Sequence, residues 1–242
     1  MKPVRVRPHQ RRAEVSHPSI YLRRDPATGP NEEARSVARA YARSIGRTLP
    51  PPRPRVKADP QTGRNIAEAY RRLRDNSQDP EVQVAYRHFA DEVLAQWEFV
   101  KPYVAVEFTA TDPYPNSAAM MQDIRENKRL KVYTGGPPHP FMSQIIEPES
   151  GQTANNIFRA VHDFFGHAKE GNQFGANGEE NAWRDHSAMF SLFAQRAMTT
   201  ETRGQNSFYN WSPENEGKPH SERTFAPQKV DLLPSEYWPE GR

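Results

Sequence analysis

Two histidines five residues apart are the clearest chemical signal in this sequence. They lie in the stretch VHDFFGHA, residues 161–168, where Asp163 follows His162 and Gly166 precedes His167. Imidazole is a common ligand of zinc, iron and other transition metals, so the pair predicts half of a metal site. The competing interpretation is a packed helix in which one histidine lies at the rim of the core and the other caps the helix end.

The histidines continue a helical pattern of apolar residues that begins near Asn155. In a regular α-helix, side chains five residues apart point about 140° apart, so His162 and His167 would not face one metal ion. Gly166 is where a local break could turn His167 back, because glycine can end or distort a helix. The apolar face of the predicted helix consists of Ile157, Phe158, Val161, Phe164, Phe165 and Ala168.

A second predicted helix, residues 179–197, carries polar residues within its apolar stripe. Glu179 and His186 lie two turns apart in that stripe, where an unpaired carboxylate or imidazole is costly to bury. We expect them either to support the metal ligands or to bind the metal themselves. Catalytic roles are assigned to Glu179, His186 and Asp163, of which Asp163 is expected to support or cap rather than to bind.

The third ligand is sought in the polar run TTETRGQNSFYNW, residues 199–211. Glu201 is the carboxylate of this run, and with the two histidines it forms a set of two imidazoles and one carboxylate. That set is the facial triad that holds Fe(II) and leaves coordination positions for dioxygen and substrate. His186 is a rival third ligand, and Glu179 and Glu180 are further alternatives.

The segment VHDFFGH resembles the iron-binding segment of the pterin-dependent aromatic amino acid hydroxylases, where a His-Asp-x-x-Gly-His run supplies two ligands. A later glutamate in a Thr-x-Glu run completes the triad in that family, and here Thr199-Thr200-Glu201 ends 34 residues after His167. The resemblance covers residues 155–205. It implies Fe(II), dioxygen, a tetrahydropterin and a small or tethered, aromatic substrate. The glycine-rich segment at residues 171–178 has no counterpart in the family pattern.

Three more residues are predicted to contact the substrate. Trp183 is a candidate wall of the pocket, although ordinary core packing explains it equally well. Arg203 and Gln205 could fix a polar group of the substrate. The alternative for Glu201 is an ion pair with Arg203 at the protein surface.

The bulk composition fits one globular domain with extensions. The chain has 242 residues, of which 35% are apolar, and a mean hydropathy of −0.94, which is enough for one core. It contains no cysteine, which excludes disulfides, thiolate metal sites and cysteine nucleophiles. No segment approaches the roughly 20 apolar residues of a membrane span, and no secretory signal is recognised. We therefore expect a cytoplasmic protein without membrane contact.

Charge is distributed unevenly along the chain. Residues 1–55 carry 13 lysines and arginines against four acids, a net +9 in a chain whose total is +3, so the remainder carries −6. Such a basic, proline-broken arm could contact nucleic acid, its own body or a neighbouring subunit of a homo-oligomer. Few aromatic residues are interleaved with these charges, so sequence-specific nucleic-acid recognition is not expected.

The spacing of apolar residues along the chain predicts an α+β, mainly α protein with one small β element. Residues 1–58 are assigned to the basic N-terminal arm, which contains one helix at 31–45. Residues 59–242 are assigned to the metal-binding catalytic domain, whose polar tail comprises residues 212–242. The other predicted elements are helices at 65–74, 80–100, 117–127, 155–165 and 179–197 and strands at 104–108 and 129–133.

The leading hypothesis is a mononuclear non-haem iron oxygenase, and two alternatives remain open. A metal-dependent phosphohydrolase of the HD type would use His162 and Asp163 as paired ligands, with His139 and Asp185 completing the set. A structural or assembly protein would instead hold a closed, purely structural metal. A zinc peptidase is poorly supported because the sequence lacks an H-E-x-x-H motif.

Overall fold

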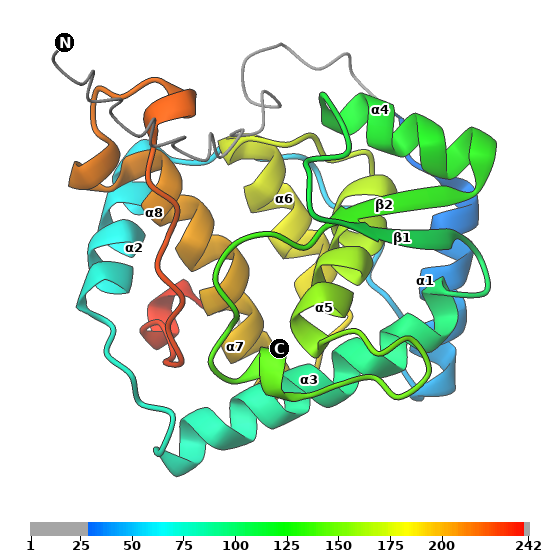
Figure 1. The fold of residues 1–242 in the computed structure, drawn as a ribbon, viewed down its shortest axis with the longest axis horizontal. Coiled ribbons are helices and arrows are strands. Elements are labelled where there is room, and N and C mark those ends of the chain that lie inside the picture. The colour runs from blue at the N-terminus through cyan, green and yellow to red at the C-terminus, as the bar shows by residue number, and fades with distance from the viewer. Residues whose placement is uncertain (1–28, 240–242) are drawn as a thin grey trace, which may run out of the picture.

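The computed structural model describes residues 29–239 and confirms the mainly helical α+β fold (Figure 1). Residues 1–28, half of the predicted basic arm, and residues 240–242 lie outside the described part. The elements are α1 (Glu32–Ser44), α2 (Pro60–Arg72), α3 (Pro80–Val100), β1 (Ala105–Thr109), α4 (Ser117–Gln122), β2 (Arg129–Tyr133), α5 (Ala154–His162), α6 (Ala176–Ser187), α7 (Leu192–Thr199) and α8 (Gln205–Trp211), with π-helical turns at Asp123–Asn127, Asp163–Ala168 and Thr200–Gly204.

The long helix α3 contributes a large buried face to the core and has the predicted ends. Asp79 caps its N-terminus by accepting hydrogen bonds from the backbone N–H groups of Glu81 and Val82. Pro80 occupies the first turn, where a helix leaves its N–H groups without internal partners. The helix packs against α5 and α7, which lie beside it in Figure 1. Its buried face includes Val82, Tyr86, Phe89, Val93, Trp97 and Val100.

The small sheet supports α5 from the side opposite α3. β1 and β2 are parallel, with Ala105 opposite Arg129, and the crossover that a parallel pair requires is supplied by α4 and the π-helical turn after it. Leu130 and Val132 of β2 are buried, and β2 packs against α5. The helix that carries the first histidine is therefore held between the sheet and the long helix α3.

The predicted single helix at residues 179–197 is wrong, because two helices occupy this range. α6 ends at Ser187, and Ser191 begins α7 by accepting a hydrogen bond from the backbone N–H of Ala194. The Ser191 N–H itself donates to the Glu92 carboxylate. The break changes the direction of Phe193, which is 47% exposed rather than part of one buried stripe.

The described part of the predicted arm packs along the body. Asn31 caps α1 with its side chain, and Ala34, Ala38 and Tyr41 of that helix belong to the main core. At the other end, the chain passes over α2 and α8, where the Tyr70 hydroxyl donates to the Pro227 carbonyl oxygen. Within residues 29–239, no helix has both the length and the apolar composition needed to cross a membrane.

Candidate metal centre

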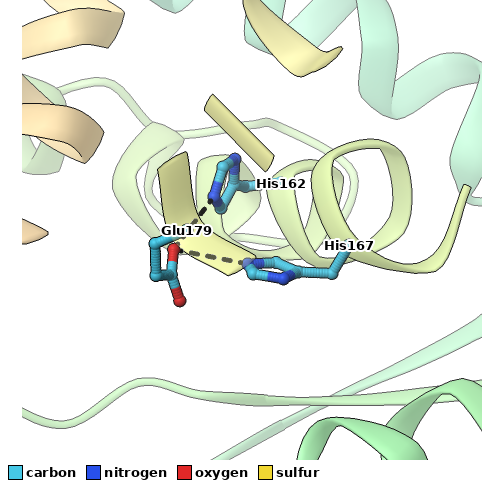
Figure 2. Close-up of side chains that lie close together, drawn as sticks. All are labelled: His162, His167 and Glu179. Carbon is cyan, nitrogen blue, oxygen red and sulfur yellow. Dashed lines mark ion pairs between the residues drawn. The ribbon is translucent and has the colours of Figure 1, made fainter. Parts of the chain in front are cut away.

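Three donor side chains converge where α5 meets α6. His162 ends α5, His167 lies in the following π-helical turn, and Glu179 lies in the first turn of α6 (Figure 2). One Glu179 oxygen, Oε2, lies 3.8 Å from His162 Nε2 and 3.5 Å from His167 Nε2. Within residues 29–239, these residues form a group whose donor atoms all lie within 4.8 Å of one another and could hold a metal ion.

A π-helical turn resolves the angular problem posed by the histidine spacing. After His162 the backbone hydrogen bonds run from residue i+5 to residue i: Lys169 N–H donates to Phe164 O, and Asn172 N–H to His167 O. This wider turn brings side chains five residues apart onto one face, whereas a regular α-helix separates them. The predicted distortion near Gly166 is present, as a widening of the helix rather than its end.

Gly166 supplies space for the first histidine. A Cβ atom at this position would lie 2.9 Å from both Cε1 and Nδ1 of His162, closer than van der Waals contact allows. The π-helical turn thus brings the imidazole ring over a position where only glycine leaves enough room.

We expect Gly166→Ala to weaken metal binding by displacing the His162 ring. A loss of about 10–100-fold in affinity is expected, as for other changes that misorient a bound histidine. The measurement is a competition titration against a chromophoric chelator, with Gly29→Ala, where a Cβ would meet open space and the backbone φ is not positive, as a folding control. Unchanged affinity in Gly166→Ala would show that the ring does not need this position.

A chain of buried hydrogen bonds orients the His162 ring. The Gln96 side-chain oxygen lies 2.7 Å from His186 Nε2, so this nitrogen carries the proton and donates. His186 Nδ1 is then an acceptor, and His162 Nδ1 donates to it over 3.0 Å. His162 therefore presents the unprotonated Nε2 towards Glu179, as a metal ligand must.

His167 is oriented by backbone and side chain together. Its Nδ1 donates to the carbonyl oxygen of Asn172 over 3.0 Å, which leaves Nε2 as the ligand atom. The Asn172 amide donates to the Gly166 carbonyl oxygen and to Asp185 Oδ2, each at 2.8 Å. Asn172 therefore fixes the turn that carries His167 and the direction of the ring at once.

The glycine-rich segment before α6 brings Glu179 to the histidines. Gly175 adopts a left-handed backbone conformation, with φ +94°, at the start of the helix. A Cβ at Gly178 would lie 1.6 Å from the backbone oxygen of Gln173. The chain therefore turns back so closely on itself that only glycine fits at this position. These glycines were a second sequence signal for a ligand at Glu179, beside its position in an apolar stripe, although the family pattern had no place for them.

The Glu179 oxygen and each histidine nitrogen are spaced nearly as two ligands of one divalent cation are. Donor atoms bound about 2.1 Å from one ion lie about 3.0–3.4 Å apart, from right-angled to tetrahedral coordination. The separations from Glu179 Oε2 to the two histidine nitrogens need only a slight contraction to reach that range. Two imidazoles and one carboxylate leave coordination positions for solvent or substrate, and the Glu179 side chain is 22% exposed.

Glu179 and the two histidines shift one another's pKa values. Burial alone would lower the pKa of His167, but the Glu179 carboxylate outweighs it and raises the pKa to about 9. Burial lowers the pKa of His162. Although burial opposes ionisation of Glu179, the two imidazoles keep its pKa well below the usual range. A metal ion would replace the proton of His167 as the partner of this carboxylate.

Glu201, the predicted third ligand, is placed elsewhere by the structure and is not part of the donor group. Its Oε1 accepts from the Tyr86 hydroxyl at 2.6 Å and from His139 Nε2 at 3.1 Å, while Oε2 accepts from the Gln205 amide at 2.7 Å. His139 Nδ1 accepts two backbone N–H groups, so its Nε2 carries the proton. Glu201 is therefore buried and links three parts of the fold: α3, α8 and the loop that precedes α5. It is not a surface partner of Arg203.

The residues assigned catalytic roles separate into three kinds. Glu179 belongs to the donor group itself. His186 is fully buried with both ring nitrogens engaged, and burial holds its pKa well below the usual value, so it orients His162 as a neutral ring. Asp163 is half-buried and outside the donor group, and burial raises its pKa to about 7.

The predicted substrate contacts are engaged within the protein. The Trp183 indole donates to the Thr199 hydroxyl at 3.0 Å, and the ring is 4% exposed. The Arg203 guanidinium stacks 4.1 Å from the Trp183 ring and pairs with Glu180. Gln205 donates to Glu201. These contacts join α6 to the end of α7 and to the π-helical turn before α8. Phe174, whose ring packs edge-on against His167 at 5.0 Å, lines the donor group.

We expect His186→Leu to reduce metal affinity by about 10–100-fold, the usual effect of removing the partner that orients a histidine ligand. The His162 ring would lose its acceptor and its preferred tautomer. The affinity is measured by the same chelator competition, with His88→Leu, a half-exposed histidine on α3, as the matched control. Equal affinities of the two variants would contradict the orienting role.

Comparisons with known proteins leave the site to be interpreted from its own chemistry. No family model, curated protein or solved structure matches the chain.

Proposed function

We propose that this protein binds one Fe(II) ion through His162, His167 and Glu179 and oxidises a small or tethered, aromatic substrate with dioxygen. The observation that carries the proposal is the convergence of one ligand atom each from His162, His167 and Glu179 within 4.8 Å. This donor set, without sulfur, is typical of non-haem iron oxygenases. When bound, the iron would supply the activation of dioxygen.

The chain's own residues would hold the ion in a fixed, largely dry setting. His186 and Asn172 fix the two rings, and the tight turn at Gly178 fixes the carboxylate. Phe158 packs against His162 and Phe165 against His186, which limits water on that side. The exposed fraction of Glu179 marks the side from which a substrate would approach.

The alternatives gain less support from the geometry. An HD-type phosphohydrolase needs Asp163 as a ligand, and Asp163 is outside the donor group. A purely structural metal favours a closed set of four ligands, whereas three donors converge here. Zinc hydrolases also use two histidines and one glutamate, so the test must compare the two metals directly.

The test is dioxygen consumption by protein loaded anaerobically with Fe(II) or Zn(II), in the presence of ascorbate or a tetrahydropterin. Tetrahydropterin is included because the resemblance to the aromatic amino acid hydroxylases implies it. We expect consumption that requires Fe(II), increases with an aromatic substrate and is absent in Glu179→Ala. Consumption no faster than in metal-free protein with either reductant, or hydrolytic activity with Zn(II) alone, would contradict the oxygenase proposal.

A further inference from the structure

A pocket separate from the donor group lies beside the end of the π-helical turn that carries His167. It has a volume of about 200 Å³ and opens between α1, the proline-rich segment that follows it, the end of the π-helical turn and α6. Its basic lining residues are Arg35, Arg39, Arg53, Lys169 and Arg184, its acidic ones are Glu170 and Asp185, and its apolar wall is Leu49, Pro50, Pro51, Pro52 and Ala188.

Positive charge exceeds negative charge in this pocket. Glu170 is shared by Arg35, with a shortest contact of 2.5 Å, and by Lys169 at 3.1 Å. Within residues 29–239, Arg39, Arg53 and Arg184 appear in no ion pair, although the Arg184 guanidinium donates to the Pro54 carbonyl oxygen. Cations collected in a concave site raise the local concentration of anions. Guanidinium groups of the pocket therefore remain available to an anion after its own carboxylates have found partners.

The walls are held in place by specific hydrogen bonds. Arg55 donates to the carbonyl oxygens of Glu170 at 2.9 Å and Gly171 at 2.8 Å. The Asn181 side chain bonds both the N–H and the carbonyl oxygen of Val56. The proline-rich segment at residues 48–55 is therefore held against α6 and the π-helical turn. Lys169 is only 6% exposed, so its ammonium group is held near the pocket rather than free in solvent.

We propose that this pocket binds the phosphate group of a small molecule, with Arg39, Arg53 and Arg184 as its main contacts. Guanidinium groups match phosphate oxygens with paired hydrogen bonds, and several of them around one cavity suit an anion with more than one charge. The volume suits a phosphate or diphosphate group rather than a length of polymer backbone, which requires an extended basic track. The proline wall would contact the organic part of a phosphate ester.

The test is calorimetric titration of the full chain with inorganic pyrophosphate and, separately, with a nucleoside diphosphate. Arg39→Gln and Arg184→Gln are compared with Arg64→Gln, an exposed arginine on α2 outside the pocket that removes the same charge. Arg39 is exposed and Arg184 half-buried, and melting temperatures confirm that the variants fold.

We expect binding of at least one probe, weakened about tenfold or more by each pocket substitution and little changed by Arg64→Gln, since a charge-assisted hydrogen bond contributes about 1.5–3 kcal/mol. Tighter binding of the nucleoside diphosphate than of pyrophosphate would indicate that the proline wall contacts the organic part of the ligand. Absence of binding by both probes at millimolar concentration would overturn the proposal. So would equal weakening in the control, or displacement of pyrophosphate by single-stranded DNA at a lower phosphate concentration.

Discussion

Replacement of Glu179 by alanine is expected to remove metal binding while the protein remains folded. Glu179 is the only one of the three donors that carries negative charge, and its Oε2 faces both histidine nitrogens. Loss of a ligand should weaken affinity by more than the roughly 10–100-fold that follows loss of an orienting partner. Chelator competition with Fe(II), Zn(II) and Co(II) measures the change.

The matched control for Glu179→Ala is Glu98→Ala, an exposed glutamate on α3 that removes the same charge. It is expected to leave metal affinity unchanged. Circular dichroism and melting temperature establish that both variants are folded at the temperature of the titration. If Glu179→Ala binds metal as the native protein does, the carboxylate of the site has been misassigned.

Replacement of Glu201 by alanine is expected to have the opposite pattern, a large loss of stability with metal binding retained. The Tyr86 hydroxyl, His139 Nε2 and Gln205 amide would lose their common acceptor inside the protein. A hydrogen bond to a charged group contributes about 1.5–3 kcal/mol, and three of them end on this carboxylate, so a decrease of about 3–5 kcal/mol in the free energy of unfolding is expected.

Urea unfolding of Glu201→Ala measures this loss, with Glu98→Ala again as the surface control, for which less than about 0.5 kcal/mol is expected. Metal affinity is titrated at low temperature, where the folded fraction is highest. Retained stability would show that the Glu201 network contributes little. A loss of metal affinity in the folded variant would show that Glu201 is a metal ligand after all.

Local features of the fold were predictable because their causes lie within a few residues. The pattern at Pro80–Val100 includes its own cap, its proline in the first turn and an unbroken apolar stripe, and the helix has these ends. The strand at Arg129–Tyr133 was likewise predicted from the alternation of its own residues. The division of residues 179–197 into two helices was missed because the apolar spacing continues across the break, while the Ser191 cap and its contact with Glu92 interrupt the backbone.

The donor group was predicted in part. Two histidines and a glycine between them showed that the helix must be distorted, and the structure contains that distortion as a π-helical turn. The third donor depends on how α6 packs against the π-helical turn after α5, a long-range property that spacing does not contain. Glu179 was flagged by its position in an apolar stripe, whereas Glu201 was favoured by a family pattern. The structure gives Glu201 three buried donors of its own.

The proline-rich segment shows a different limit. Its composition is typical of a linker, since prolines lack N–H donors and stiffen an extended chain. Its attachment depends on Arg55 reaching backbone oxygens and on Asn181 reaching Val56, which no local pattern indicates. The segment therefore becomes one wall of the basic pocket instead of a spacer between two parts of the chain.

The most direct test of an open iron site built from two histidines and Glu179 is electron paramagnetic resonance of the Fe(II) protein after addition of nitric oxide. The spectrum is recorded for the native protein, His162→Ala, Glu179→Ala and Glu201→Gln at equal iron concentration. We expect a high-spin iron–nitrosyl signal in the native protein and in Glu201→Gln, and none in the other two variants. Absence of the signal in the native protein, or a signal that depends on Glu201 and not on Glu179, would contradict this assignment.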